Sequence, residues 1–271
     1  MTTASPALNS DGLNLAEPDS GAPRTAVLFD LDGTLVDPAG GITGGIAHAL
    51  GAMNLPVPDA EVLQAMIGPK LADALISIVG VPADQVDEVI AHYRKWYTAQ
   101  GMAMSQVYPG IKELLTQLKA DGVALAVATQ KPEPLANKLL AHHGLDGFFH
   151  VIRGSHADET LKPGDADYRP GKAEIIGAAL RDLALLTDRL TDQDSRLPAI
   201  MVGDRHQDVL GARSNGLECI GVAWGFAPDG ELAAAGVAAV VRSTVELAAE
   251  LAGFGSLAAT VASGKVANGA V

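Results

Sequence analysis

VLFDLDGTLVD, residues 27–37, carries the clearest signal of how this chain folds. It begins with three hydrophobic residues and is interrupted by Gly33, so it predicts a buried strand that ends in a turn. Asp30 and Asp32 follow the strand directly. Because residues i and i+2 of an extended segment point the same way, both carboxylates should face one ligand at the carboxyl edge of an α/β sheet, where ligands bind.

These two carboxylates also indicate a bound cation and a type of reaction. Held close together, they repel one another unless a hard cation with oxygen ligands sits between them, and Mg²⁺ is the natural choice. An aspartate can also act as a covalent nucleophile, and that reaction needs a second group to handle the proton of the leaving group. We expect Asp30 and Asp32 to divide these two tasks.

Residues 30–37, DLDGTLVD, resemble the first motif of the haloacid dehalogenase superfamily, in its phosphatase branch. The family pattern is Asp-x-Asp-x-Thr after a hydrophobic strand, and the chain matches it at Asp30, Asp32 and Thr34. The resemblance implies that Asp30 is the nucleophile and a metal ligand, and that Asp32 is a general acid, then a base, with its backbone carbonyl on the metal. It also places Gly33 at the substrate. The alternative is an acidic turn without catalytic function.

Composition limits the classes of function. The 271 residues are 48% hydrophobic, enough for a substantial core, and their 19 basic and 32 acidic residues give a net charge of −13. That charge disfavours a nucleic acid as partner but leaves a small phosphate ester open. Cys219 is the single cysteine, so no internal disulfide can form, and no apolar run has the length of a membrane span. We expect a soluble, cytoplasmic protein without a membrane partner.

Changes in pattern along the chain predict its division into parts. After the first strand comes a block with helical periodicity and no strand signal, as expected of a helical cap inserted into a sheet protein. One group of the superfamily carries such a cap at this point. We predict a flexible N-terminal extension at residues 1–23, a catalytic core at 24–37 and 108–253, the cap at 38–107, and a flexible tail at 254–271.

Two features of the cap block bear on function. A cluster of glycines at its start indicates either a hinge between two bodies or a loose helix start; it consists of Gly40, Gly41, Gly44 and Gly45. IGPKL, residues 67–71, resembles a cap segment that faces the active site in phosphoglycolate phosphatase-like members of the family. Lys70 is therefore a candidate substrate-binding residue, and the alternative is a solvated lysine at a helix start.

A second strand, predicted at residues 123–128, ends at Thr129. This position resembles the second motif of the family, whose hydroxyl hydrogen-bonds the phosphoryl group with support from backbone N–H groups. Gln130, where family members often carry Asn or Ser, is a candidate substrate-binding residue. A threonine at a strand end is common, so this assignment depends on its place in the order of motifs.

The third motif requires a lysine beside the nucleophile, because the charges of the aspartate and the phosphate must be screened before attack. Lys162, in LKPG, resembles the Lys-Pro form of this motif. Lys172 directly precedes an amphipathic helix, and Arg169 with Lys172 matches an Arg-x-x-Lys pattern of related phosphatases. We favour Lys172 as the catalytic and substrate-binding lysine, because a helix start fixes its position better than a loop fixes Lys162. The alternative for either is an exposed lysine.

The fourth motif resembles Gly-Asp-x-x-x-Asp after a strand predicted at residues 199–202. By resemblance, Asp204 is a direct Mg²⁺ ligand, and Asp208 acts through water or holds the loop. Arg205 either orients this acidic loop or forms a surface salt bridge. A lone motif of this kind is a weak signal. The series of strand-end sites at Asp30, Thr129 and Asp204, with a lysine between the last two, is much stronger.

The whole sequence predicts an α/β protein with a three-layer, Rossmann-like core, a mainly parallel sheet and an inserted helical cap. The resemblance implies Mg²⁺-dependent hydrolysis of a small phosphorylated metabolite, phosphoglycolate or a nucleoside monophosphate, through an aspartyl-phosphate. A phosphomutase of the β-phosphoglucomutase type and a non-catalytic phospho-ligand binder are the alternatives. Substrate choice is expected in cap residues such as Lys70 and Arg94, and the oligomeric state is expected to be monomer or homodimer.

Overall fold

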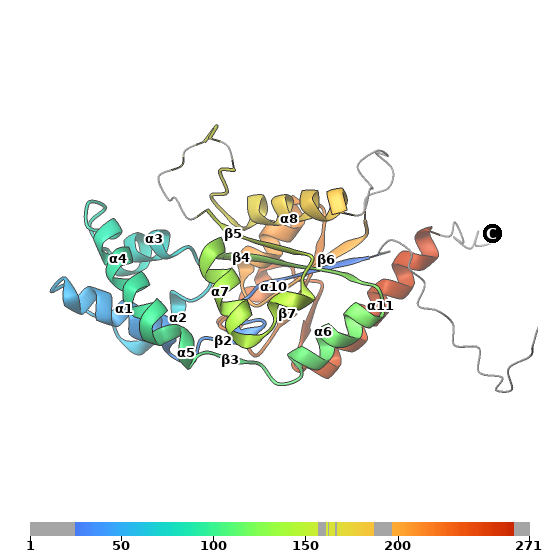
Figure 1. Ribbon diagram of the computed structural model, residues 1–271, viewed down its shortest axis with the longest axis horizontal. Helices are drawn as coiled ribbons and strands as arrows, with labels where there is room; N and C mark the ends of the chain where they lie inside the picture. Colours follow the sequence, from blue (N-terminus) through green and yellow to red (C-terminus); the bar gives the residue numbers. More distant parts are fainter. Residues whose placement is uncertain (1–24, 157–160, 162, 166, 187–196, 263–271) are drawn as a thin grey trace, which may run out of the picture.

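The computed structural model describes residues 25–156, 161, 163–165, 167–186 and 197–262. These residues form a sheet flanked by helices and a separate group of helices beside it (Figure 1). The predicted N-terminal extension and Lys162 lie outside the described residues. Within the described part of the chain, no helix is both long enough and apolar enough to cross a membrane.

The core is a parallel sheet whose central strand is β1 (Ala26–Phe29). On one side of it lie β4 (Ala124–Pro132) and β5 (Val151–Ser155), and on the other β6 (Ala199–Gly203), β7 (Glu218–Val222) and β8 (Ala239–Val241), in the order β5-β4-β1-β6-β7-β8. The chain therefore builds one half of the sheet and then returns past β1 to build the other. Such a switch in strand order opens a crevice for ligands at the carboxyl ends of the strands.

Helices cover both faces of this sheet, because successive residues of β1 point to opposite sides. Val27 and Phe29 belong to the layer of α6 (Ile111–Ala120), α7 (Glu133–His143) and α11 (Thr244–Ala262), with the short η3 (Asp146–Phe148) beside it. Ala26 and Leu28 belong to the layer of α8 (Lys172–Leu186), α9 (His206–Ser214) and α10 (Glu231–Ala235). In Figure 1, α8 lies above the sheet and α6 and α11 lie below it. The predicted three-layer α/β core is confirmed.

The separate group of helices lies between two short antiparallel strands, β2 (Val36–Asp37) and β3 (Gln106–Val107). Its members are α1 (Gly41–Ala52), α2 (Ala60–Ala65), α3 (Leu71–Ala74), η1 (Leu75–Val79), α4 (Val86–Trp96), η2 (Tyr97–Gly101) and α5 (Met102–Met104). We propose that this unit is the cap predicted at residues 38–107. The prediction that this block contains no strand is wrong, since β3 lies inside it. Two residues are too few to show an alternating pattern.

Two local expectations were wrong, and the glycine cluster, whose role as a hinge stays a prediction, proves to be closely packed. The chain from residue 254 is not all tail, since α11 continues to Ala262, as its alanine-rich sequence permits. The strand expected to end before Thr129 continues to Pro132, with a shift of register after Ala128. Most of the glycine cluster lies inside α1, where a Cβ on Gly41 would collide with the carbonyl oxygen of Gly101. Close packing of helices therefore explains these glycines better than a loose helix start does.

Candidate active site

The side chains that the sequence singled out meet at the carboxyl ends of β1, β4 and β6. Asp30 and Asp32 follow β1, Thr129 lies near the end of β4, and Asp204 follows β6. All four are buried, with Asp204 fully inaccessible to solvent. Three neighbouring parallel strands that end together thus bring residues from distant parts of the sequence to one place, which is the switch point of the sheet.

Three carboxylates form the centre of this site. One oxygen from each of Asp30, Asp204 and Asp208 lies within 4.8 Å of the other two. Burial and the charges of Asp30 and Asp208 raise the pKa of Asp204 well above its ordinary value. Burial also raises the pKa of Asp208 to about 6, although the Lys172 ammonium opposes this. The ionised forms of Asp204 and Asp208 are therefore unfavourable in this structure, as expected of carboxylates at a site where a cation binds.

The donor set fits a hard divalent cation. Asp30 Oδ1 and Asp208 Oδ1 are buried and accept no hydrogen bond of good geometry from the described residues, although both approach Lys172. Carboxylate oxygens of this kind are the ligands that Mg²⁺ prefers. The Asp32 side chain is not part of this cluster. That arrangement is compatible with the expectation that Asp32 offers its backbone carbonyl instead.

The first motif also fixes the position of Asp204. Thr34 Oγ1 donates a hydrogen bond to Asp204 Oδ1 at 3.2 Å, and the backbone N–H of Phe226 donates to Oδ2 at 2.8 Å. Gly33 has φ +86°, and a Cβ there would collide with the Asp204 carboxylate. Its N–H donates to the carbonyl of Val36, so the described structure gives Gly33 a role in packing. Its contact with substrate stays a prediction.

Lys172, the first residue of α8, supplies positive charge to the cluster. Its Nζ lies 2.8 Å from Asp30 Oδ1 and 2.6 Å from Asp208 Oδ1, and it donates to the carbonyl of Ala128 at 2.8 Å. Burial lowers the pKa of Lys172, but the carboxylates of Asp208 and Asp30 outweigh this and raise it. The lysine favoured from the sequence thus lies beside the predicted nucleophile. Lys162 cannot be compared with it, since it lies outside the described residues.

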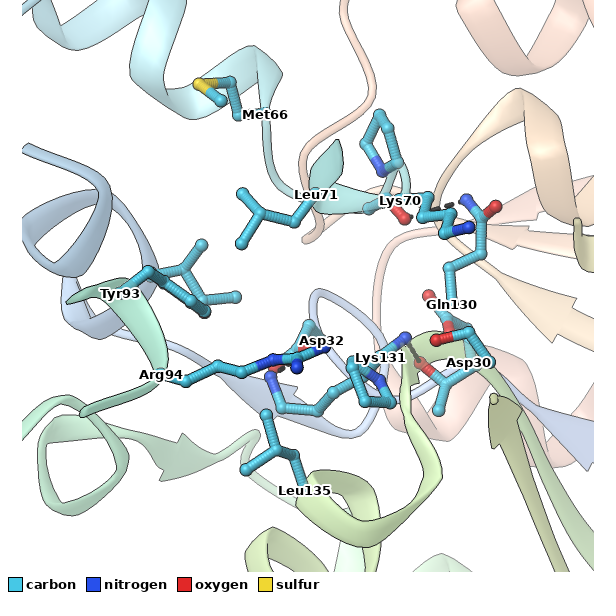
Figure 2. Close-up of a pocket in the computed structure, with 16 residues that line it drawn as sticks. Asp30, Asp32, Met66, Lys70, Leu71, Tyr93, Arg94, Gln130, Lys131 and Leu135 are labelled. Atoms are coloured by element: carbon cyan, nitrogen blue, oxygen red, sulfur yellow. Dashed lines mark hydrogen bonds and ion pairs between the residues drawn. The ribbon is translucent and has the colours of Figure 1, made fainter. Parts of the chain in front are cut away.

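A cavity of about 60 Å³ lies over Asp30 and Asp32, between the core and the helical unit (Figure 2). The helical unit contributes both apolar and cationic side chains to its wall. Lys70 lies beside Gln130, and Arg94 points toward Asp32. Together with Lys131 from the core, these residues surround the two carboxylates with positive charge, which suits a phosphorylated ligand. The cavity is lined by Asp30, Asp32, Ile42, Met66, Gly68, Pro69, Lys70, Leu71, Tyr93, Arg94, Thr129, Gln130, Lys131, Pro132, Leu135 and Ser155.

Lys131 is a site residue that the sequence reading missed. Its Nζ lies 2.8 Å from Asp32 Oδ2, and both side chains are buried. Burial raises the pKa of Asp32, the direction that a proton donor requires, while the ammonium of Lys131 opposes it. A signal existed, because Lys131 follows Thr129 at i+2 and extended backbone turns both side chains the same way.

Two hydrogen bonds fasten the segment around Gly68 to the core. Gln130 Nε2 donates to the carbonyl of Gly68 at 2.9 Å, and Arg205 Nη1 donates to the carbonyl of Ile67. Arg205 is buried and also pairs with Glu231 at 2.9 Å, so the surface salt bridge considered for it is wrong. Its backbone N–H donates to Asp208 Oδ2 at 3.0 Å, in agreement with a role in orienting the acidic loop.

Comparison with known proteins places these features in a family. The family model described as haloacid dehalogenase-like hydrolase matches residues 27–222. A 5'-nucleotidase of Pseudomonas aeruginosa is 36% identical over 208 residues, which cover 77% of this chain and 86% of that protein. The crystal structure of a predicted phosphatase from Clostridium acetobutylicum has a TM-score of 0.73 and 35% identity, covering 85% of this chain and 99% of that chain.

A further relative has a different name. The tyrosine-protein kinase PtkA of Mycobacterium tuberculosis is 38% identical over 200 residues, which cover 74% of this chain and 62% of that protein. The similarity therefore spans less than two thirds of that relative's length. The rest of PtkA has no counterpart in the match.

Proposed function

The chain belongs to the haloacid dehalogenase-like hydrolase family, and we propose that it is a phosphoric monoester hydrolase that passes through a phosphorylated Asp30. The observation that carries this proposal is the position of Lys172, which lies 2.8 Å from Asp30 and 2.6 Å from Asp208 at the point where the strand ends meet. A buried nucleophile with a cation beside it, facing a cavity with further cations, is what phosphoryl transfer requires.

Two carboxylates carry out the chemistry. A carboxylate oxygen of Asp30 forms a bond to phosphorus while the bond from phosphorus to the ester oxygen breaks, and Asp32 gives its proton to that oxygen. Asp32 then accepts a proton from a water molecule whose oxygen attacks phosphorus. The bond from phosphorus to Asp30 breaks, and inorganic phosphate leaves. The hydroxyl of Thr129 and the ammonium of Lys172 would bind the oxygens of the transferred group.

Asp30, Asp204 and Asp208 would hold Mg²⁺, together with the backbone carbonyl of Asp32. Their closeness, their burial and the raised pKa values of Asp204 and Asp208 support this assignment. When bound, the metal would screen the negative charges of carboxylate and phosphoryl oxygens. Thr34, through its hydrogen bond to Asp204, would keep one ligand in place.

The substrate would be a small phosphomonoester. The cavity over Asp30 and Asp32 is lined by the cations Lys70, Arg94 and Lys131, which suits an anionic ester. A nucleoside monophosphate is suggested by the 5'-nucleotidase relative, and phosphoglycolate is the second candidate. Lys70, Gln130 and Arg94 line the wall and would contact the part of the substrate that is not transferred.

The test is phosphate release from phosphoglycolate, nucleoside monophosphates, sugar phosphates and pyrophosphate, each with Mg²⁺ or EDTA. We expect one ester to be hydrolysed rapidly with Mg²⁺ and a hydroxylamine-sensitive phosphoenzyme to form on wild-type protein. Asp30→Asn should lower the rate by at least about 10³-fold. Asp84→Asn, an exposed change in the helical unit, is the control.

Other functions give different results in the same assay. Isomerisation of a sugar phosphate without phosphate release would indicate a phosphomutase. Binding without turnover by folded protein would indicate a non-catalytic binder. Because PtkA is named a tyrosine-protein kinase, ATP with a tyrosine-containing peptide belongs in the panel, and phosphopeptide formation that depends on Asp30 would favour that activity instead.

A further inference from the structure

We propose that Lys131 is a positioning residue for Asp32, and that Tyr97 of the helical unit makes this positioning depend on closure over the substrate. This dependence of Asp32 positioning on closure of the helical unit is called the coupling. It rests on the proposed function, in which Asp32 protonates the leaving oxygen. It adds a residue that the four sequence motifs do not contain. It also assigns a specific task to the contact between the two parts of the molecule.

The first step of the argument is the contact between Lys131 and Asp32. Lys131 comes from the end of β4 and Asp32 from the turn after β1, and their charged atoms lie 2.8 Å apart. The ion pair engages Asp32 Oδ2 only, and Oδ1 is buried without a hydrogen-bond partner in the described structure. Because Asp32 lines the cavity, Lys131 holds the carboxylate by one oxygen and leaves the other for the substrate (Figure 2).

The second step is the contact between Lys131 and the helical unit. The Nζ of Lys131 lies 4.5 Å from the centre of the Tyr97 ring, and this ring is fully buried. An ammonium group over an aromatic face is attracted by the ring, most strongly where water is excluded. Tyr97 is thus one contact of the helical unit with the Lys131 and Asp32 pair, in addition to Arg94, which points toward Asp32.

Features of Tyr97 itself support a role beyond packing. It begins η2, a π-helical turn, and such turns occur frequently at functional sites. Its hydroxyl is buried and makes no hydrogen bond of good geometry within the described residues; burial raises the pKa of this hydroxyl, and the nearby ammonium of Lys131 opposes the rise. Tyr93 stacks on it with ring centres 5.5 Å apart, which fixes the plane of the ring against Lys131.

The third step is the effect that closure of the helical unit has on the ion pair between Lys131 and Asp32. An exposed lysine and aspartate pair is worth about 0–1 kcal/mol and holds neither side chain firmly. Covering the pair with Tyr97 removes water, and the same attraction becomes stronger in the less polar surroundings. Asp32 is then held in one orientation, and Lys131 stabilises the carboxylate that remains after its proton has been given to the leaving group.

The test compares two aryl phosphates of nearly equal size, phenyl phosphate and p-nitrophenyl phosphate. Phenol needs a proton to leave, whereas p-nitrophenolate leaves readily without one, so a defect in Asp32 affects the first ester more. We expect Lys131→Met to lower kcat/KM by about 10²-fold for phenyl phosphate and by no more than roughly threefold for p-nitrophenyl phosphate. Lys131→Arg should restore part of the loss, because it returns a cation to Asp32.

Tyr97 variants test the dependence on the helical unit. Tyr97→Phe keeps the ring beside Lys131 and removes only the hydroxyl, so it should retain most of the wild-type ratio of kcat/KM between the two esters. Tyr97→Leu removes the ring and should show the selective loss on phenyl phosphate. The matched control is Lys119→Met, which removes an exposed lysine that lies 6.0 Å from the ring of Phe148 and outside the cavity.

Equal losses on both esters in Lys131→Met would overturn the proposal, because a purely structural defect does not distinguish leaving groups. A ratio of kcat/KM between the two esters that is the same in Lys131→Met as in wild type would overturn the proposal as well. If Lys131→Met does not fold, the Tyr97 pair decides: a selective loss in Tyr97→Leu alone supports the coupling, and identical behaviour of the two variants overturns it. Undiminished phosphate release by Asp30→Asn, or none by wild type from any ester, would instead remove the proposed function and the coupling with it.

Discussion

Lys172 Nζ lies 2.8 Å from Asp30 Oδ1, although Asp30 follows β1 and Lys172 begins α8, far away in the sequence. The same ammonium group lies 2.6 Å from Asp208 Oδ1, so it serves two buried carboxylates. Asp204 belongs to the same cluster and brings a third. One cation against three carboxylates leaves an excess of negative charge when all are ionised, and this excess explains why the site should depend on a metal.

Lys172→Met keeps most of the volume of the side chain and removes its charge. Breaking a buried ion pair in this way should lower the free energy of unfolding in EDTA by about 3–5 kcal/mol, because the carboxylates lose their cation. Mg²⁺ should recover part of that loss, while phosphate release stays at least about 10²-fold below wild type. Urea unfolding with and without Mg²⁺ measures the stability. Unchanged stability in EDTA would show that Lys172 does not balance the cluster.

Mg²⁺ should raise the stability of wild-type protein, since it binds the folded site and not the unfolded chain. At 100 times the dissociation constant the gain is roughly 2.7 kcal/mol. Asp204→Asn should abolish the gain while leaving the protein in EDTA at least as stable as wild type. The reason is that the raised pKa of Asp204 marks an unfavourable charge, which asparagine removes. Thermal unfolding at constant ionic strength is the measurement, and an equal Mg²⁺ effect in both proteins would contradict the assignment.

Gly33→Ala should disturb the metal site through Asp204. Gly33 has φ +86°, and an added Cβ would collide with the Asp204 carboxylate. Gly216→Ala is the matched control, because Gly216 has φ +72° and nothing within 4 Å of the added atom. In both variants, the left-handed backbone conformation should lower the free energy of unfolding by about 1–2 kcal/mol. The collision with Asp204 should lower it further in Gly33→Ala and weaken Mg²⁺ binding by that variant. Equal stability and equal Mg²⁺ affinity of the two variants would contradict the close approach.

Glu231 should contribute stability that depends on pH. Burial raises the pKa of Glu231, but hydrogen bonds from Arg205 and His206 outweigh it and leave the pKa below the ordinary value of 4.5. A depressed carboxyl pKa stabilises the fold above pH 4.5, and the contribution disappears as the pH falls through the folded-state value. Glu231→Gln should therefore be less stable than wild type at pH 7, and the difference should shrink below pH 4.5.

Urea unfolding of both proteins across this range, with the exposed change Glu113→Gln as control, provides the measurement. A difference between wild type and Glu231→Gln that stays constant down to the lowest pH would mean that the charge of Glu231 is not what binds Arg205. A difference that grows on acidification would have the opposite sign from the one expected for a depressed carboxyl pKa.

The core fold and most of the residues around Asp30 could be predicted from the sequence. Hydrophobic runs that end in Asp30, Thr129 and Asp204 indicate strands with polar ends, and the carboxyl ends of neighbouring parallel strands meet at one edge. The family membership that the sequence suggested is confirmed by the match at residues 27–222. The choice of Lys172 follows from the start of a helix, a feature that local sequence specifies well.

Features that depend on contacts between distant segments appear only in the folded chain. The i+2 spacing from Thr129 turns Lys131 to the same side of the chain, but its pairing with Asp32 arises only because β4 lies beside β1 and Tyr97 of the helical unit packs against its ammonium group. Arg205 looks like a surface residue until Glu231 and the carbonyl of Ile67 surround it. Local periodicity reports which face of a strand or helix is apolar. Which charged groups meet is set by the packing of whole elements, and the sequence does not state it.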